Sequence, residues 1–389
     1  MMRIRLILIG CVAGWTSGPT AQVLPPATTW GGPRTHVTEI APPTHIRFAP
    51  DGPQEEDGWV RLDGGRLLLR PIDWPEAEPG SNTFIRMQLQ SAGDPWDKSG
   101  TVFALPAEDG PAFLAAARVE SWAGPAPIPI ELLRFITPFG VGHFNDRPKV
   151  DSIRPVYVPQ WAEEVVWQAD ITHLQHWLGG SGWLGVYLDT WSAAGQTFHL
   201  THHATSPAYP LSDPYTVPAI GVLPLALTTK LLPGTSDATF FPDRPLEVSF
   251  DVPEGVAESA LFATVTGHGG HAGGDEFTPQ EHVVSLDGVI RERWTPWRDD
   301  CAGFRRFNPA SGVWSVPYPS NPPGAEERLA SSDLSRSNWC PGSHVAPRIL
   351  ELGALTPGRH TLTWAIPTAQ RASEDAFNFW NIGLYWVYR

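Results

Sequence analysis

Lysine is nearly absent from this chain of 389 residues. Only Lys98, Lys149 and Lys230 are present, and none of them stands in a Gly-Lys-Ser or Gly-Lys-Thr motif. The sequence therefore excludes a phosphate-binding loop of that type. The formal net charge is −14, and no run of Lys or Arg offsets it, so we expect no nucleic-acid partner.

Other motifs of well-known enzymes are missing as well. No HEXXH zinc motif occurs, and GGSGW at residues 179–183 lacks the second glycine of the hydrolase motif GxSxG. A glycine-rich turn explains that stretch. After the N-terminal segment, no stretch is long and apolar enough to cross a membrane, so the sequence predicts no membrane span.

The first residues look like a secretory signal peptide. Arg3 and Arg5 give a basic start, Leu6–Trp15 is a short apolar run, and we place cleavage after residue 21. We therefore predict a secreted or periplasmic protein. The alternative is a lipoprotein anchored through Cys11, because the residues before it also fit a bacterial lipobox.

Removal of that segment leaves two cysteines, Cys301 and Cys340. In an exported chain the simplest interpretation is one disulfide, which would stabilise the fold by roughly 3–4 kcal/mol. A two-cysteine metal site is the alternative, but neither residue has a close Cys or His partner at zinc spacing.

Proline and glycine are abundant, with 41 and 37 residues, and indicate many turns. Apolar residues alternate with polar ones in PLEVSFDV (245–252) and HTLTWAI (360–366), which predicts half-buried strands. GLYWVYR (383–389) closes the chain in the same style. The best helical candidate is DITHLQHWLGG (170–180). Short strands without strand–helix alternation favour antiparallel β sandwiches.

The Pro-rich segment 204–218 is the predicted boundary between two such domains. We expect an N-terminal domain over residues 51–208 and a C-terminal domain over residues 213–389. Residues 22–50 are rich in Pro and Thr and predict a loosely attached arm.

Five histidines could build a copper or zinc site. They are His199, His202 and His203 in FHLTHH, and His268 and His271 in a glycine-rich loop. On a strand, however, His199 and His203 share one face while His202 points to the other. An HxxH in a glycine loop is weakly specific, and a solvated or substrate-facing pair is the alternative.

Carboxylates are the remaining candidates for chemistry. Asp94 and Asp97 flank Pro95-Trp96, Asp189 lies in an apolar strand, and Glu276 follows the glycine loop. An acidic residue in an apolar strand is costly unless it is paired or functional. Asp97 also fits the role of an aspartate that forms a turn. Asp189 also fits a strand-end cap or a buried ion pair. The residues alone leave these alternatives open.

Five separated stretches, in order, resemble the peptide-N-glycosidase F family of amidases, which remove N-linked glycans from asparagine. They are GDPWDKSGTV, LLRFITPFGVG, VYLDTWSAAG, TGHGGHAGGDEF and DLSRSNWCPG. The resemblance implies an all-β fold of two adjacent antiparallel jelly-roll β-sandwich domains with the active site at their interface. It also implies chemistry without a cofactor or a metal, and we expect a monomer.

The resemblance assigns roles to individual residues. It places catalytic carboxylates at Asp97, Glu276 and Asp189, the active-site arginine at Arg336, and a disulfide at Cys301 and Cys340. The substrate-binding candidates are Arg336, Lys98, Trp96, Trp191, His268 and His271. For Trp96 and Trp191 a core role is equally compatible with the sequence. The sequence departs from the family at Asp189, where Glu is usual, and at Lys98, which replaces an Arg.

The expected reaction is hydrolysis of the amide between an asparagine side chain and N-acetylglucosamine in glycoproteins or glycopeptides, which releases the intact glycan. We expect Asp97 to handle the proton, Glu276 to activate water and Asp189 to support the water network. Arg336 should hold Glu276 ionised and leave Asp97 or Asp189 as the carboxyl with the raised pKa. With the shorter Asp189 and with Lys98 as a less rigid cation than Arg, we predict a pH optimum below neutrality.

Three other functions fit the same residues. A glycoside hydrolase would use Asp97 and Glu276 to cut between sugars. A glycan-binding protein would keep the cleft without the chemistry. A copper-dependent monooxygenase would use the histidines.

Overall fold

The structure is a computed structural model. It describes residues 34–77, 80–119, 126–145, 158, 160–206, 219–232, 237–269, 274–311, 330–373 and 377–389. The predicted signal peptide with Cys11, most of the predicted boundary 204–218, and His271 lie outside these residues.

The described chain is built mainly of strands. In its first half these are β1 (Arg34–Ile46), β2 (Glu55–Glu56), β3 (Trp59–Leu62), β4 (Leu67–Trp74), β5 (Asn82–Ser91), β6 (Ser99–Pro106), β7 (Ile130–Ile136), β8 (Val165–Asp170), β9 (Gly180–Leu188) and β10 (Gln196–Ser206). The short helices between them are η2 (Asp63–Gly65), α1 (Gly110–Ala117), η3 (Thr172–Leu174) and α2 (Gln175–Leu178).

The second half continues in the same style. Its strands are β11 (Gly221–Leu227), β12 (Leu246–Val252), β13 (Ser259–His268), β14 (His282–Leu286), β15 (Val289–Trp294), β16 (His344–Val345), β17 (Arg348–Glu351), β18 (Gly358–Ala365) and β19 (Phe379–Tyr388). Two 3-10 turns, η5 (Cys301–Phe307) and η6 (Ser331–Asp333), precede β16.

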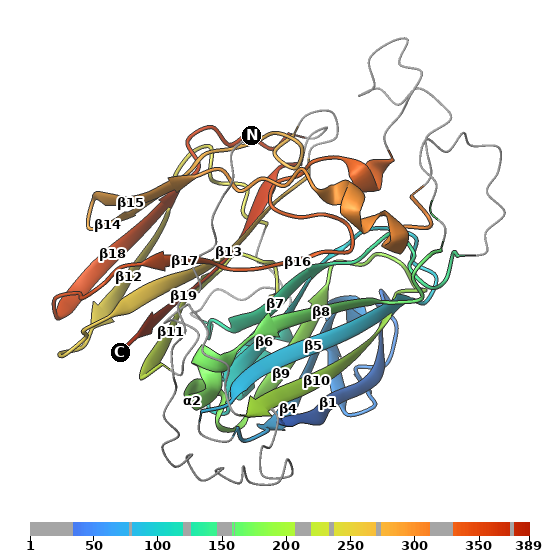
Figure 1. The fold of residues 1–389 in the computed structure, drawn as a ribbon, viewed down its shortest axis with the longest axis horizontal. Helices are drawn as coiled ribbons and strands as arrows, with labels where there is room; N and C mark the ends of the chain where they lie inside the picture. Colours follow the sequence, from blue (N-terminus) through green and yellow to red (C-terminus); the bar gives the residue numbers. More distant parts are fainter. Residues whose placement is uncertain are drawn as a thin grey trace, which may run out of the picture.

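Four sheets form two sandwiches that lie side by side (Figure 1). The first sandwich pairs the order β1-β10-β5-β8 with the order β16-β7-β6-β9-β4-β3-β2, and the second pairs β11-β19-β13-β17 with β12-β18-β14-β15. All the strand pairs are antiparallel. The prediction of an all-β fold with two adjacent antiparallel sandwiches is confirmed.

Strand β1 corrects the predicted arm. Residues 34–46 pair with β10 from Arg34 opposite Ser206 to Ile46 opposite Gln196, so they are part of the sheet. The register shifts between Ala41 and Thr44, around the two prolines. Because β1 is an edge strand and the prolines lie at a bulge, the missing N–H groups do not break the sheet.

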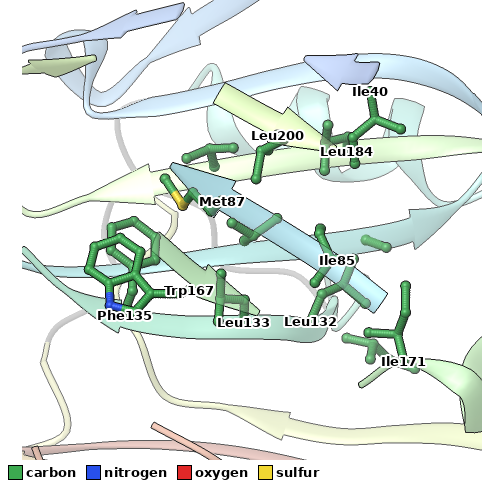
Figure 2. Packing of buried hydrophobic residues seen from close by; sticks show 14 of the residues in the cluster. Ile40, Ile85, Met87, Leu132, Leu133, Phe135, Trp167, Ile171, Leu184 and Leu200 are labelled. Carbon is green, nitrogen blue, oxygen red and sulfur yellow. The ribbon is translucent and has the colours of Figure 1, made fainter. Parts of the chain in front are cut away.

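The core of the first sandwich lies between its two sheets. Ile85 and Met87 of β5 and Leu200 of β10 face Leu184 of β9 across this layer (Figure 2). At one end, Trp167 of β8 stacks on Phe135 of β7 with ring centroids 5.0 Å apart. Alternate residues of β5 are buried, as expected for a strand with one face on a core.

Strands β13 and β19 are buried on both faces. Ala260, Phe262, Tyr385 and Val387 join the core of the first sandwich, and their chain neighbours face the core of the second. The middle sheet therefore packs against both halves of the molecule. This corrects the expectation that GLYWVYR is half-buried, since a second layer covers the face that we expected to meet solvent.

A buried ion pair fastens the two sandwiches together. Arg134 of β7 binds Glu131 through two hydrogen bonds of 2.8 Å, and both side chains are almost completely buried. The Nη1 of Arg134 also donates to the carbonyl oxygen of Asn381 at 2.6 Å and to Thr266 Oγ1 at 3.2 Å. The side chain of Arg134, in the RFITP stretch, thus reaches across to β13 and β19.

The predicted helix at 170–180 is shorter than expected. It consists of η3 and α2, and strand β9 begins at Gly180. The apolar residues Ile171, Leu174 and Leu178 of this stretch are buried. None of the described helices has the length and apolar character needed to cross a bilayer.

Candidate active site

Asp97 lies on the loop between β5 and β6, and Thr137 at the end of β7 fixes that loop. The Oγ1 of Thr137 donates to the carbonyl oxygen of Trp96 at 3.2 Å and accepts from the N–H of Lys98 at 2.8 Å. The N–H of Thr137 donates to the carbonyl oxygen of Lys98 at 2.8 Å. The residue between Trp96 and Lys98 is therefore held from both sides, and the side chain of Asp97 is 19% exposed.

Asp94 connects this loop to the segment that carries Asp189. It is completely buried, its Oδ1 accepts from the N–H of Trp96 at 3.1 Å, and its Oδ2 accepts from Thr190 Oγ1 at 2.7 Å. The first aspartate of the DPWD stretch is thus structural. Because its two oxygens bind two different loops, it places Asp97 and Asp189 in one region of the molecule.

Glu276 comes from the glycine-rich connection between β13 and β14. Gly269 has φ +80°, and a Cβ there would collide with the carbonyl oxygen of Phe377, so only glycine fits. In this conformation the N–H of Gly269 donates to Glu276 Oε2 at 3.1 Å. The neighbouring Asp275 is buried and accepts from Trp380 Nε1 at 3.0 Å, so it serves the fold.

Arg336 joins the two carboxylates. Its Nε donates to Glu276 Oε1 at 3.0 Å, and its Nη2 lies 3.7 Å from Asp97 Oδ2. The remaining donors bind Ser331 and the carbonyl oxygen of Leu334. The guanidinium is 1% exposed and lies over the rings of Phe277 and Trp339. Arg336 therefore binds the two carboxylates from the buried side of the site.

Asp189 follows β9 and is bound at one oxygen. Its Oδ1 lies 3.3 Å from Arg66 Nη1 and accepts from the hydroxyl of Tyr187 at 3.4 Å. Its N–H donates to the carbonyl oxygen of Ser99. The side chain is 40% exposed, so the other oxygen is open to a ligand or to solvent.

A cavity of about 160 Å³ lies at the junction of the two sandwiches and receives all three carboxylates. Its lining residues come from both halves of the chain: Asp97, Lys98, Ser99, Ile136, Tyr187, Asp189, Thr229, Lys230, Asp237, His268, Gly269, Glu276, Trp339, Phe379 and Asn381. The lining is rich in acidic groups, with lysine and aromatic side chains beside them.

Burial raises the pKa of all three carboxyls. It raises the pKa of Glu276 to about 7, although Arg336 opposes the shift, and the charge of Asp97 adds to it. Burial likewise raises the pKa of Asp97 against Arg336 and Lys98, and the pKa of Asp189 against Arg66 and Lys98. The expectation that Arg336 keeps the pKa of Glu276 low is therefore wrong, because the loss of hydration outweighs one ion pair.

A site of buried carboxyls that share one arginine can hold and pass a proton near neutral pH. Since Asp97 and Glu276 bind the same guanidinium and repel each other, they titrate as a pair. One carboxyl then remains protonated while the other is ionised, which is the arrangement that general acid and base catalysis requires.

Comparison with known proteins identifies the family of this chain. A family model described as Peptide-N-glycosidase F, N terminal, matches residues 39–203, and one described as Peptide-N-glycosidase F, C terminal, matches residues 237–387. The chain belongs to the peptide-N-glycosidase F family. The resemblance seen in its motifs is thereby confirmed.

Solved structures of related proteins agree. PNGF-II is 30% identical, with a TM-score of 0.77 over 91% of this chain and 66% of its own. The present chain thus spans about two thirds of the length of PNGF-II. PNGase F from Flavobacterium meningosepticum is 16% identical and shares the fold, with a TM-score of 0.58 over 92% of this chain and 96% of its own. No curated protein sequence matches the chain.

The aromatic candidates of this family member lie outside the core. Trp96 is 52% exposed and Trp191 is 60% exposed, so the core alternative is wrong for both. Trp191 is nevertheless held in place, because Arg66 lies 4.1 Å from its ring centroid and Phe48 packs against it. An exposed, fixed indole next to Asp189 is suited to stack on a sugar face.

His268 lines the cavity as a neutral residue. It stacks between Trp339 and Phe379, and its Nε2 lies 2.7 Å from Thr266 Oγ1. Burial lowers its pKa to about 3, with Arg134 and Arg336 adding to the effect. His268 therefore carries no charge at neutral pH, and its role in binding substrate stays a prediction.

The histidines of FHLTHH are divided as predicted. His202 of β10 is buried, whereas His199 and His203 lie on the other face of the strand. His199 is within hydrogen-bonding distance of Gln88 and Glu39. Within the described residues, no group of three or more His, Cys, Asp or Glu side chains is placed to hold a metal ion.

Cys301 and Cys340 form the predicted disulfide. It joins η5 to the segment that carries Arg336, and Arg336 also forms a β-bridge with Arg298 just before η5. The two-cysteine metal site is therefore excluded. The covalent link fixes the chain four residues after the arginine of the site.

Sequence reasoning missed several residues of this region. Arg66 and Thr137 fix Asp189 and the Asp97 loop, while Lys230 and Asp237 line the cavity. Thr137 could have been found because it lies within the RFITP stretch. The only sequence signal for Lys230 was the rarity of lysine. No sequence pattern pointed to Asp237.

Proposed function

We propose that this protein is a peptide-N-glycosidase, an amidase that cleaves between an asparagine side chain and N-acetylglucosamine. The observation that carries the proposal is the joint binding of Asp97 and Glu276 by Arg336 beside a cavity that also contains Asp189. Family membership supports it. One solved structure of this fold is named as a peptide-N(4)-(N-acetyl-β-D-glucosaminyl)asparagine amidase.

The reaction consumes one water molecule. Its oxygen bonds to the side-chain carbonyl carbon of asparagine, and the bond from that carbon to the amide nitrogen breaks. One proton of the water is transferred to the nitrogen, and the other is lost from the new carboxyl group. The products are an aspartate and the intact glycan as a glycosylamine.

Glu276 and Asp97 divide the proton transfers. Glu276 accepts a proton from the attacking water, a task favoured by a pKa of about 7 near the working pH. Asp97 lies on the rim formed by the first sandwich and carries the proton to the leaving nitrogen. Arg336 keeps the two carboxyls at fixed positions while their charges change.

Asp189 supports the water from the other side of the cavity. Its single bound oxygen, held by Arg66 and Tyr187, leaves the second one free to accept a hydrogen bond. Asp is shorter than the Glu usual in the family, so we propose that it acts through water. Trp96, Trp191 and Lys98 bind the sugar and peptide around this centre.

We further propose an exported enzyme that acts as a monomer on N-glycosylated proteins or glycopeptides. The basic and apolar N-terminal segment supports export. The enzyme chemistry proposed here uses side chains alone and needs no cofactor.

The decisive experiment is digestion of an N-glycopeptide in ¹⁸O-labelled water, with both products read by mass spectrometry. An amidase converts Asn to Asp with one ¹⁸O and releases the whole glycan. A glycoside hydrolase would leave N-acetylglucosamine on an unchanged Asn. A glycan-binding protein would yield neither product. The Asp97→Asn variant is the control for contaminating activity and should release glycan about a thousandfold more slowly than the parent.

A further inference from the structure

Two of the three lysines in the chain line the candidate site. Lys98 and Lys230 both face the cavity of about 160 Å³, one from each sandwich. Elsewhere the positive charge of this protein is carried almost entirely by arginine. An ammonium is a compact charge with three freely oriented donors, whereas arginine is a fixed planar fork. The use of lysine here points to a flexible donor for a ligand.

Lys230 has a carboxylate neighbour, Asp237, on the same wall of the cavity. Lys230 follows β11, and Asp237 lies further along the same connection. Within the part of the chain that the structure describes, no ion pair within 4.0 Å joins the two side chains, and the Asp237 carboxylate accepts a hydrogen bond from its own backbone. Both are partly buried and line the cavity with Thr229. Because both charged side chains border the same cavity, a ligand in the cavity can reach both of them.

Lys230 acts electrostatically on Asp237, and Asp237 acts on Asp189. Burial raises the pKa of Asp237, and the charge of Lys230 opposes that shift. Asp237 in turn contributes to the raised pKa of Asp189. Lys230 and Asp237 therefore line the same cavity as Asp189, although they come from the second sandwich.

We propose that Lys230 and Asp237 bind adjacent hydroxyl groups of the N-acetylglucosamine attached to asparagine, and so determine the specificity for the sugar. This inference rests on the proposed function. Each sugar hydroxyl is both a donor and an acceptor. One hydroxyl accepts from the ammonium of Lys230 and its neighbour donates to the carboxylate of Asp237.

The charges of the cavity favour a neutral ligand at this place. An anion would meet the four carboxyl groups of Asp97, Asp189, Asp237 and Glu276. A cation would meet the ammonium groups of Lys98 and Lys230. A polyhydroxylated ring satisfies donors and acceptors of both signs without bringing a charge of its own into a partly buried site.

The test uses Lys230→Met and Asp237→Asn in the full chain. The probe is free N,N′-diacetylchitobiose, which contains the sugar and lacks the peptide and the scissile amide. Its inhibition constant is measured against hydrolysis of an N-glycopeptide, together with KM and kcat. Each variant should raise KM and the inhibition constant about tenfold or more, as expected for a lost hydrogen bond to a charged group. The kcat should change less than about threefold.

Matched controls are Arg359→Met and Asp251→Asn. These residues form an exposed cation–carboxylate pair on β18 and β12, with side chains 69% and 75% exposed. They should leave KM and the inhibition constant unchanged. Lys230→Arg should restore part of the chitobiose affinity, and thermal unfolding of all variants should show that the fold is intact.

The outcomes separate this inference from the proposed function. If the parent protein does not cleave the glycopeptide, the proposed function fails, and direct titration with chitobiose still tests whether Lys230 and Asp237 bind sugar. If the parent cleaves but both variants keep the parent inhibition constant, the inference is overturned. A fall in kcat with unchanged chitobiose affinity would overturn it as well, because it would show an effect on the chemistry.

Discussion

Arg336 donates a hydrogen bond from Nε to Oε1 of Glu276 at 3.0 Å, and this contact joins two segments 60 residues apart in the sequence. The same guanidinium lies 3.7 Å from Asp97, which belongs to the other sandwich. Since the guanidinium of Arg336 is buried and its donors are occupied, we expect its charge to act on the two carboxyls more than on a ligand. It is the centre of the proposed machinery.

Replacement of Arg336 by Met should lower kcat by about 100-fold or more, which is the usual effect of removing one electrostatic group from an active site. Without the arginine, the pKa values of Glu276 and Asp97 should both rise further, because its charge lowers both. The pH–rate profile should shift to higher pH. Arg336→Lys should recover part of the rate; a profile identical to that of the parent protein would contradict this role.

The pH dependence follows from the pKa of Glu276. Glu276 must be ionised to accept a proton from water, and burial raises its pKa to about 7. The rate should therefore fall about tenfold per pH unit below pH 7, and the optimum should lie at or above neutrality. This revises the optimum below neutrality that the sequence suggested. An initial-rate series on a glycopeptide from pH 4 to 10 measures it, and a flat acid side would contradict the base role.

Asp189→Asn should reduce the rate less than Asp97→Asn. We expect a loss of about tenfold for Asp189→Asn and of about a thousandfold for Asp97→Asn, which handles the proton directly. Asp189 is 40% exposed, and Arg66, which holds it beside Trp191, keeps its ion pair with Asp63 when Asp189 is neutralised. Steady-state kinetics of both variants and of Asp189→Glu test this order. Equal losses would place Asp189 in the proton transfer itself.

Arg134→Met should destabilise the whole protein. It leaves Glu131 buried without its partner and removes the hydrogen bonds to β13 and β19, at a cost of about 3–5 kcal/mol. Urea unfolding measures the loss. Breaking the exposed pair Arg293–Glu281 with Arg293→Met should cost less than about 1 kcal/mol. Equal costs would show that Arg134 does not hold the sandwiches together.

Activity should survive treatment with EDTA, since the proposed proton transfers use carboxyl groups. The glycopeptide assay is repeated after chelation and after dialysis, with metal content measured in parallel. Loss of activity that copper or zinc restores would favour a histidine site and would count against the amidase mechanism described above.

Local sequence patterns predicted the positions of individual strands better than they predicted which faces of those strands are buried. Alternation in 245–252 and 360–366 corresponds to β12 and β18. The same alternation in β19 does not reveal that a second layer covers it, because the partner surface is distant in the sequence. The arm predicted at 22–50 was misjudged over residues 34–46, because the prolines there resemble a loop although a bulged edge strand tolerates them.

The site was predicted from motifs and not from physical patterns. Asp97, Glu276 and Arg336 lie in such motifs, and the structure brings them together. Lys230 and Asp237 belong to none, so only the fold places them in the cavity. The pKa of Glu276 could not be predicted because it depends on burial, which a sequence does not state.

The carboxyl groups of the site come from both sandwiches, so their protonation is linked to the packing of the two sandwiches against each other. Asp97 comes with one half and Glu276 with the other, so docking brings two acidic groups together. A raised pKa means that the docked state prefers the protonated form of Glu276, whose ordinary pKa is 4.5. This contribution to stability is complete below about pH 4.5 and is lost as the pH rises through about 7. Alkaline conditions should therefore weaken the junction of the two sandwiches, and Arg336 limits this effect because its charge stabilises the ionised Glu276.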